Sequence, residues 1–157
     1  MAIRKRFDRT LYTKYDALAK EATTHYLTGQ GYTVNGHPNR YAQDLIFGHF
    51  EPAKVYDLDT VSCAECEVKL VWNGETFPYD TVQLPERKKK FFNAPTRFFI
   101  WNSTLTTAAT FWSNDIKDLE PVEVPNKYVY KGEYFYQIPL DMVTFVTIQH
   151  NLELPTP

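Results

Sequence analysis

The sequence predicts an α/β fold in which a mixed central β-sheet is flanked by helices and followed by a β-rich carboxy-terminal part. Three observations predict it. A segment with helical periodicity precedes several short extended segments. The run 97–101 is almost continuously apolar, which is typical of a strand buried on both faces. Hydrophobic residues make up 43% of the 157 residues, with eleven Phe and eleven Tyr, and this favours one sheet-rich domain over 1–157.

The predicted elements follow one another along the chain. Small and apolar residues recur at helical spacing over 14–28, and Gly29 and Gly31 supply a stop signal, so the first helix is expected there. Pro85 is expected to open a short helix over 85–92, because its fixed φ suits the first helical position. Strands are expected at 32–34, 44–47, 61–72, 81–84 and 97–101, and shorter extended pieces at 110–112, 122–124, 128–130, 134–136 and 143–148.

The charge pattern narrows the function classes. The formal net charge is −2, so a generally cationic surface for nucleic acid is excluded. Basic residues nevertheless gather at 4–9 and at 87–90, where they either contact phosphate or form a solvated surface. No apolar run is long enough to cross a bilayer and the amino-terminal residues lack a signal-peptide stretch, so a cytoplasmic protein without a membrane partner is expected.

The two cysteines, Cys63 and Cys66, form a C-x-x-C pattern that invites a zinc or redox interpretation. No second pair completes a zinc site. Both cysteines lie in the predicted strand 61–72, where residues three apart point to opposite faces. We therefore expect two buried thiols that do not meet.

An acid-x-Lys pattern occurs three times, and its context favours Glu67-Val68-Lys69 over the copies at 86–88 and 115–117. Only the first copy lies in an apolar strand, where Glu67 and Lys69 would share a face with Cα atoms roughly 6.5 to 7 Å apart. Burying two charged side chains in so apolar a strand costs free energy on the order of several kcal/mol, unless the charges are paired or solvated in a cleft. The pattern indicates either a functional pair or a plain salt bridge on the wet face of an edge strand.

Asp44 opens the preceding predicted strand and could face Glu67 across it. Two carboxylates, waters and a substrate phosphate are what Mg²⁺ prefers, and a lysine beside them could stabilise the water that attacks. Asp44 could instead cap a turn. Asp57 and Asp59 alternate on one face of the intervening segment, so either could replace Asp44 as a ligand.

At this point the chain resembles the PD-(D/E)xK nuclease superfamily, which includes restriction enzymes, junction resolvases and phage-encoded endonucleases. The resemblance rests on an ordered series: a helix with Glu21, then Asp44, then Glu67-Val68-Lys69, then a Gln-x-x-x-Arg-Lys element from Gln83 to Lys88. It covers about 14–102, with 103–157 as a β-rich extension of the same domain. Two departures are Gln43, where the motif has Pro, and a long spacing between Asp44 and Glu67.

The resemblance implies a restriction-endonuclease-like fold and a Mg²⁺- or Mn²⁺-dependent endonuclease acting on DNA. Asp44, Glu67 and the Val68 carbonyl would hold the metal, and Lys69 would assist the attacking water. Glu21 would be an additional acid of the site or a surface residue. The resemblance directs Gln83 and Arg87 at the substrate or at the catalytic lysine. A partly basic helix face would let Arg87, Lys88 and Lys90 contact phosphate.

The alternative is a non-catalytic nucleic-acid-binding module, or a phage structural or accessory module, that has this fold. The complete set of Asp44, Glu67 and Lys69 favours the enzyme, because an unused site has no physical reason to keep all three charges. The sequence leaves a monomer and a homodimer open, as well as the kind of DNA.

Overall fold

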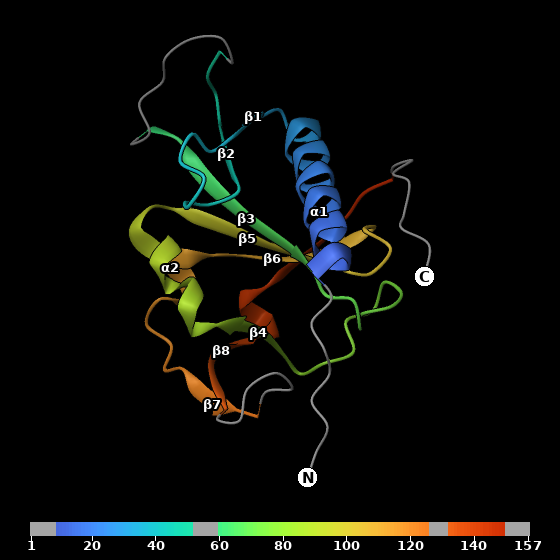
Figure 1. The fold of residues 1–157 in the computed structure, drawn as a ribbon, viewed down its shortest axis with the longest axis vertical. Helices are drawn as coiled ribbons and strands as arrows, with labels where there is room; N and C mark the ends of the chain where they lie inside the picture. The colour runs from blue at the N-terminus through green and yellow to red at the C-terminus, as the bar shows by residue number, and fades with distance from the viewer. Residues whose placement is uncertain (1–8, 52–59, 126–131, 150–157) are drawn as a thin grey trace.

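The computed structural model describes residues 9–51, 60–125 and 132–149 (Figure 1). It shows an α/β fold with a mixed six-stranded sheet in the order β1-β2-β3-β5-β6-β9 and a second, three-stranded sheet in the order β4-β8-β7. The elements of the main sheet are β1 (Thr33–Gly36), β2 (Leu45–Gly48), β3 (Ser62–Val68), β5 (Thr96–Trp101), β6 (Thr107–Trp112) and β9 (Thr144–Thr147). The others are α1 (Arg9–Gly29), β4 (Thr81–Pro85), η2 (Glu86–Asn93), α2 (Ser113–Ile116), β7 (Val122–Val124), β8 (Glu133–Pro139) and η3 (Leu140–Met142).

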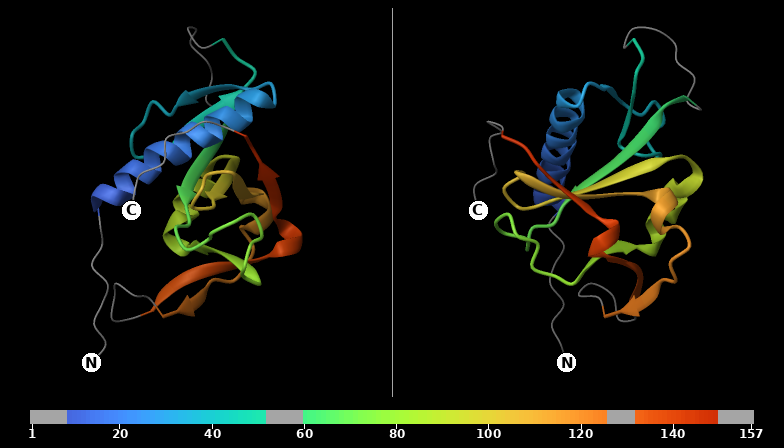
Figure 2. Two further views of the ribbon diagram at one scale, coloured as in Figure 1. Left: turned by 90° about the vertical axis from the view of Figure 1, so that its right-hand side faces the viewer. Right: turned by 180° about the vertical axis from the view of Figure 1, so that it is seen from behind.

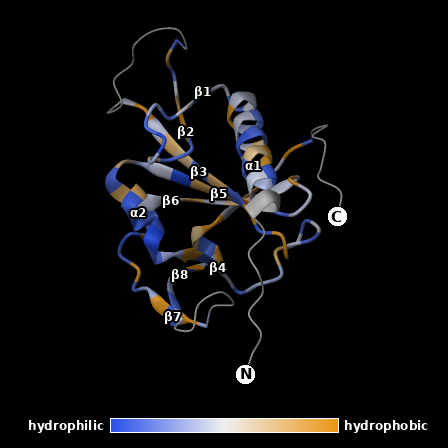
Figure 3. Ribbon diagram, in the orientation of Figure 1, coloured by the Kyte–Doolittle hydropathy of each residue, from blue (hydrophilic) through white to orange (hydrophobic). Residues whose placement is uncertain are grey.

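Three layers result. Helix α1 crosses one face of the main sheet, and the second sheet lies against the opposite face together with η2 and α2 (Figures 1 and 2). Hydrophilic and hydrophobic residues alternate along α1, as expected for a helix with one face on a sheet (Figure 3). None of the helices in the described ranges is both long and apolar enough to span a membrane.

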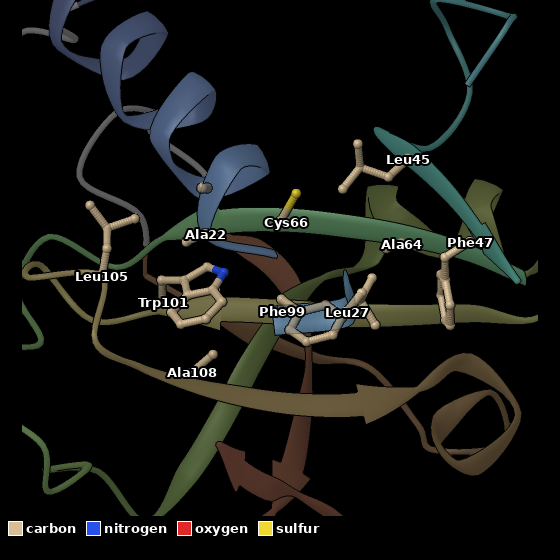
Figure 4. Packing of buried hydrophobic residues seen from close by; sticks show 11 residues of the cluster. Ala22, Leu27, Leu45, Phe47, Ala64, Cys66, Phe99, Trp101, Leu105 and Ala108 are labelled. Carbon is tan, nitrogen blue, oxygen red and sulfur yellow. The ribbon is translucent and has the colours of Figure 1, made fainter. Parts of the chain in front are cut away.

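Helix α1 confirms the helix expected at 14–28 and begins earlier, at Arg9. Its fully buried residues Ala19, Ala22 and Leu27 pack on Cys66, Phe99 and Trp101 of the sheet (Figure 4). The helix ends where expected: Gly31 has a φ of 94°, a left-handed conformation that glycine adopts without a steric penalty. The Tyr32 N–H then closes the end by donating to the Leu27 carbonyl at 3.1 Å.

Strand β3 is shorter than the expected strand 61–72. It pairs antiparallel with β2 and parallel with β5, and it ends at Val68. Lys69 makes one more backbone bond, to the Trp101 carbonyl at 2.8 Å, and the chain then turns so that the Trp72 N–H donates to the Lys69 carbonyl at 3.0 Å. The indole of Trp72 is fully buried in the core on the opposite side of the sheet from α1. Burying this large ring stabilises the fold more than further strand pairing of β3 would.

The cysteine prediction is confirmed. Cys63 and Cys66 are buried free thiols that belong to different core clusters, because residues three apart on β3 point to opposite faces. Strand β5 is likewise buried as predicted, with Phe98, Phe99 and Trp101 at 2% exposure or less.

The carboxy-terminal part is divided between the two sheets. Strands β6 and β9 extend the main sheet, whereas β8 pairs with β4 on one side and with β7 on the other in the second sheet. The helix expected at 85–92 is a 3₁₀ helix, η2, that begins after Pro85. The basic residues at 4–6, the segment with Asp57 and Asp59, and the extended piece expected at 128–130 lie outside the described residues.

Candidate active site

The candidate site lies at the edge of β3 beside the start of β2. The last paired residues of these strands are Leu45 and Ala64, so the edge of β3 beyond Ala64 is not paired with β2. Asp44 stands there. Its Oδ2 accepts the Cys66 N–H at 3.0 Å, and its own N–H donates to Glu65 Oε1 at 3.1 Å. The backbone N–H groups of Cys66 and Asp44 therefore hold the carboxylates of Asp44 and Glu65, and the two acids lie close enough for the charge of Asp44 to act on Glu65.

One lysine approaches each carboxylate from either side of the sheet. Lys88 Nζ, from η2, lies 2.6 Å from Glu65 Oε2. Lys20 Nζ, from α1, lies 3.7 Å from Asp44 Oδ1. The side chains of the Lys88–Glu65 pair are only 20% and 10% exposed, against 47% and 24% for the Lys20–Asp44 pair, so water screens the first pair less.

Burial and crowding change the acid–base behaviour of these groups. Burial, and next the charge of Asp44, raise the pKa of Glu65 to about 7, against the opposing effect of Lys88. Burial lowers the pKa of Lys88, but the neighbouring Glu65 carboxylate outweighs it, so that pKa is raised. The pKa of Asp16 is also raised, by partial burial and then by Asp44. Asp44 therefore lies close enough to two other acids to raise their pKa, with Lys20 and Lys88 beside them.

The structure places the predicted residues as follows. Asp44 lies at the start of β2, as expected, and its carboxylate caps an N–H of β3 rather than a turn. Glu67 is half-buried on β3, and burial raises its pKa while Lys88, Arg87 and Lys69 lower it. Val68 is the last residue of β3. Lys69 therefore follows the strand instead of sharing a strand face with Glu67, and its Nζ lies 4.9 Å from the ring centroid of Tyr79.

Glu65 was not among the residues predicted from the sequence, and Lys88 was predicted only as a phosphate contact. Glu65 belongs to the same face of β3 as Glu67, and it is the acid that contacts Asp44. The sequence signal was the Glu65-Cys66-Glu67 alternation. Lys88 was expected on a basic helix face, yet it points at Glu65, because in a 3₁₀ helix it shares a stripe with the buried Phe91 three residues later.

The remaining predicted residues lie around the site. Glu21 is exposed, and Lys20 is the α1 side chain that contacts Asp44. Gln83 is exposed on β4. Arg87 forms an ion pair with Glu133, and Lys90 Nζ lies 4.9 Å from the ring centroid of Phe91.

Gln43 joins the mouth of β2 to the end of η2. Its side chain is 3% exposed, and Nε2 lies 3.2 Å from the Phe91 carbonyl oxygen and 3.0 Å from Thr96 Oγ1. Asn93 Oδ1 is a further acceptor at 3.2 Å. Proline, which the nuclease motif has at this position, could make none of these bonds. The bonds of Gln43 therefore fix η2, which carries Lys88, relative to Asp44.

The donor set fits a hard cation in part. Within the described ranges, no group of three or more His, Cys, Asp or Glu side chains is arranged to hold a metal ion. Asp44 and Glu65 form a pair of neighbouring acids. A Mg²⁺ ion commonly binds one or two carboxylates and takes waters and substrate oxygens as its other ligands. No protein-family model, curated protein or solved structure matches the chain.

Proposed function

We propose that this protein is a metal-dependent endonuclease that hydrolyses phosphodiester bonds of DNA, within a restriction-endonuclease-like fold. The observation that carries the proposal is the pair of carboxylates, Asp44 and Glu65, held side by side with the Lys88 ammonium against Glu65. The order of the elements along the chain supports it, because the resemblance to PD-(D/E)xK nucleases implies an aspartate at the start of one strand and an acid on the next strand. Glu65 takes the place that the sequence analysis gave to Glu67.

Each side chain has a role in this proposal. Asp44 and Glu65 bind Mg²⁺ or Mn²⁺, which when bound supplies positive charge for the phosphate and a water of lowered pKa. Lys88 holds an N–H towards the attacking water or the phosphate oxygen that gains charge. The water oxygen bonds to phosphorus and the water gives up a proton to solvent. One P–O ester bond breaks, the leaving oxygen takes up a proton from solvent, and the products are a phosphate monoester and an alcohol. Glu67 lies next along β3 and holds the water network or a further cation contact.

Lys88 replaces Lys69 as the lysine of the proposed reaction. Its Nζ contacts the acid pair, whereas Lys69 lies beyond the end of β3 against Tyr79. A lysine assists a water only within hydrogen-bond reach of it, directly or through one further water. Lys69 still lowers the pKa of Glu67, so it contributes positive charge to the wider site.

One observation favours the alternative, a non-catalytic nucleic-acid-binding or phage accessory module. The acids already have cationic partners, because Lys20 contacts Asp44 and Lys88 contacts Glu65. Such a network can be purely structural. Metal binding separates the two functions, since a nuclease must exchange these partners for the ion while a structural network has no reason to.

The deciding experiment is plasmid nicking with Mg²⁺, with Mn²⁺ and with EDTA. We expect nicking that depends on the metal and that is lost in Glu65→Gln and in Lys88→Ala. Lys117→Ala is the matched control, because Lys117 is an exposed lysine after α2. Nicking that survives in EDTA, or that survives both site substitutions, would contradict the proposal.

A further inference from the structure

The loop between β1 and β2 carries an exposed aromatic side chain next to the candidate site. Tyr41 is 74% exposed, more than any other large hydrophobic side chain in the described ranges. A single exposed aromatic residue is ordinary on a protein surface. What distinguishes Tyr41 is its ordered loop, its cationic neighbour and its place beside Asp44.

Hydrogen bonds order this loop. Asn39 Oδ1 accepts the Tyr41 N–H at 3.0 Å, and the Asn39 carbonyl accepts the Ala42 N–H at 3.1 Å. His37 Nδ1 in turn accepts the Asn39 N–H at 3.0 Å. The loop is tied at its start by the bond from the His37 N–H to the Asp44 carbonyl, and at its end by the buried Gln43. An ordered ring loses less conformational entropy on binding than a mobile one.

Arg40 adds positive charge to the same place. Its guanidinium carbon lies 4.7 Å from the Tyr41 ring centroid, and its Nη2 donates a hydrogen bond to the Tyr41 hydroxyl. Arg40 is exposed, and it forms no ion pair with a carboxylate in the part of the chain that the structure describes. A cation and an aromatic face side by side are the two features with which proteins bind single-stranded nucleic acid.

The separation of Tyr41 and Asp44 along the chain is comparable to the length of a few nucleotides of one strand. Tyr41 precedes Asp44 by three residues, so their Cα atoms are at most about 11 Å apart. Successive nucleotides of one strand rise about 3.4 Å each, so a strand with a phosphate at Asp44 could reach Tyr41 within about three nucleotides.

We propose that Tyr41 and Arg40 form a binding site for an unpaired nucleotide, with the base stacked on the ring and a phosphate on the guanidinium. Bases inside a duplex are stacked on their neighbours, so only an unpaired base offers its face to Tyr41. The inference deepens the proposed function and rests on it for the position of the DNA. It selects a single strand, or DNA unpaired near the cut, as the substrate class.

Binding without cleavage tests this site. Affinity is measured in EDTA for a single-stranded oligonucleotide containing 2-aminopurine and for the duplex of the same sequence. The wild-type protein should bind the single strand more tightly and quench the 2-aminopurine fluorescence. Tyr41→Ala should weaken single-strand binding by about five- to 150-fold, the range found for base–aromatic stacking, and abolish the quenching. Tyr41→Phe should retain both.

Matched variants separate the site from general surface effects. Tyr134→Ala removes a tyrosine that is 48% exposed on β8, and it should bind like the wild type. Arg40→Gln should flatten the dependence of single-strand affinity on salt by about 0.7 units of logarithmic slope, while Lys117→Gln should not. A wild-type protein that binds neither DNA, or equal losses in Tyr41→Ala and Tyr134→Ala, would overturn the proposal.

The outcome is independent of hydrolysis. A protein that binds the single strand through Tyr41 but never nicks DNA would contradict the proposed nuclease and leave this site in place. If the wild-type protein nicks DNA and Tyr41→Ala binds the single strand normally, the nuclease proposal stands and the Tyr41 site is contradicted.

Discussion

Lys88 Nζ lies 2.6 Å from Glu65 Oε2, although the two residues are 23 positions apart and come from different elements, η2 and β3. Both side chains are shielded from water, and Asp44, the second acid of the site, donates its N–H to Glu65 and raises the pKa of Glu65 through its charge. This contact assigns the lysine of the candidate site.

Lys88→Ala should remove most cleavage and keep the metal. Its proposed role is in the transition state, and losing an acid–base or charge-stabilising group of this kind costs about 10²- to 10⁴-fold in kcat. Lys69→Ala should have a much smaller effect, because Lys69 lies against Tyr79. Single-turnover cleavage rates compare the two variants. If Lys69→Ala loses more of the cleavage rate than Lys88→Ala does, Lys69 is the lysine that assists the reaction, as the motif implies.

Metal binding should depend on Asp44 and Glu65 more than on Glu67. Calorimetric titration with Mn²⁺ should show no binding to Asp44→Asn or Glu65→Gln and a smaller loss for Glu67→Gln. Near pH 6.5 binding should also release protons, because the cation displaces the proton that Glu65 retains. Wild-type affinity in Asp44→Asn and Glu65→Gln would contradict this ligand pair.

Without metal, ionisation of Glu65 should destabilise the folded protein. The folded-state pKa is raised from 4.5 to about 7, so between these values the folded state binds more protons than the unfolded state. The contribution of Glu65 to the free energy of unfolding therefore falls as pH rises from about 4.5 to about 7. Urea unfolding in EDTA at pH 5 and pH 8 measures the fall. Glu65→Gln should flatten it, and an unchanged pH dependence in that variant would refute the assignment.

Gln43→Leu should lower both stability and the cleavage rate. The substitution removes the donor that reaches the buried Phe91 carbonyl and the buried Thr96 hydroxyl, and a lost donor to a buried polar group costs about 1–3 kcal/mol. It also frees η2 from the mouth of β2, so kcat should fall while Mn²⁺ affinity, set by β2 and β3, is kept. Gln137→Leu, at an exposed glutamine of β8, is the control for both measurements.

The exposed basic residues of η2 should contribute to phosphate binding separately from Lys88. Replacing Arg87 and Lys90 together by Gln should flatten the salt dependence of duplex binding by about 0.9 units of slope for each lost contact. Metal affinity should not change. An unchanged slope would mean that this face is only solvated, and that the ion pair of Arg87 with Glu133 is structural.

Local patterns in the sequence determined α1, β2, β5 and the strand that carries Glu67, because helical spacing and apolar runs act over a few residues. They also placed Asp44 at the mouth of its strand. They did not place Glu65 in the site, and they gave Lys88 a contact with phosphate rather than with an acid. Whether Glu65 meets Asp44 depends on where β2 stops pairing along β3, between Leu45 and Ala64.

Only the tertiary structure decided which lysine meets the acids. The chain turns after Lys69, where the N–H of the buried Trp72 bonds to the Lys69 carbonyl, and the Lys69 side chain lies against Tyr79. The bonds of Gln43 and the burial of Phe91 bring η2 back against β3, and Lys88 comes with η2. Such contacts join residues tens of positions apart, and their free energy comes from burial and hydrogen bonds that exist only once the layers are packed, so no periodicity in the sequence reports them.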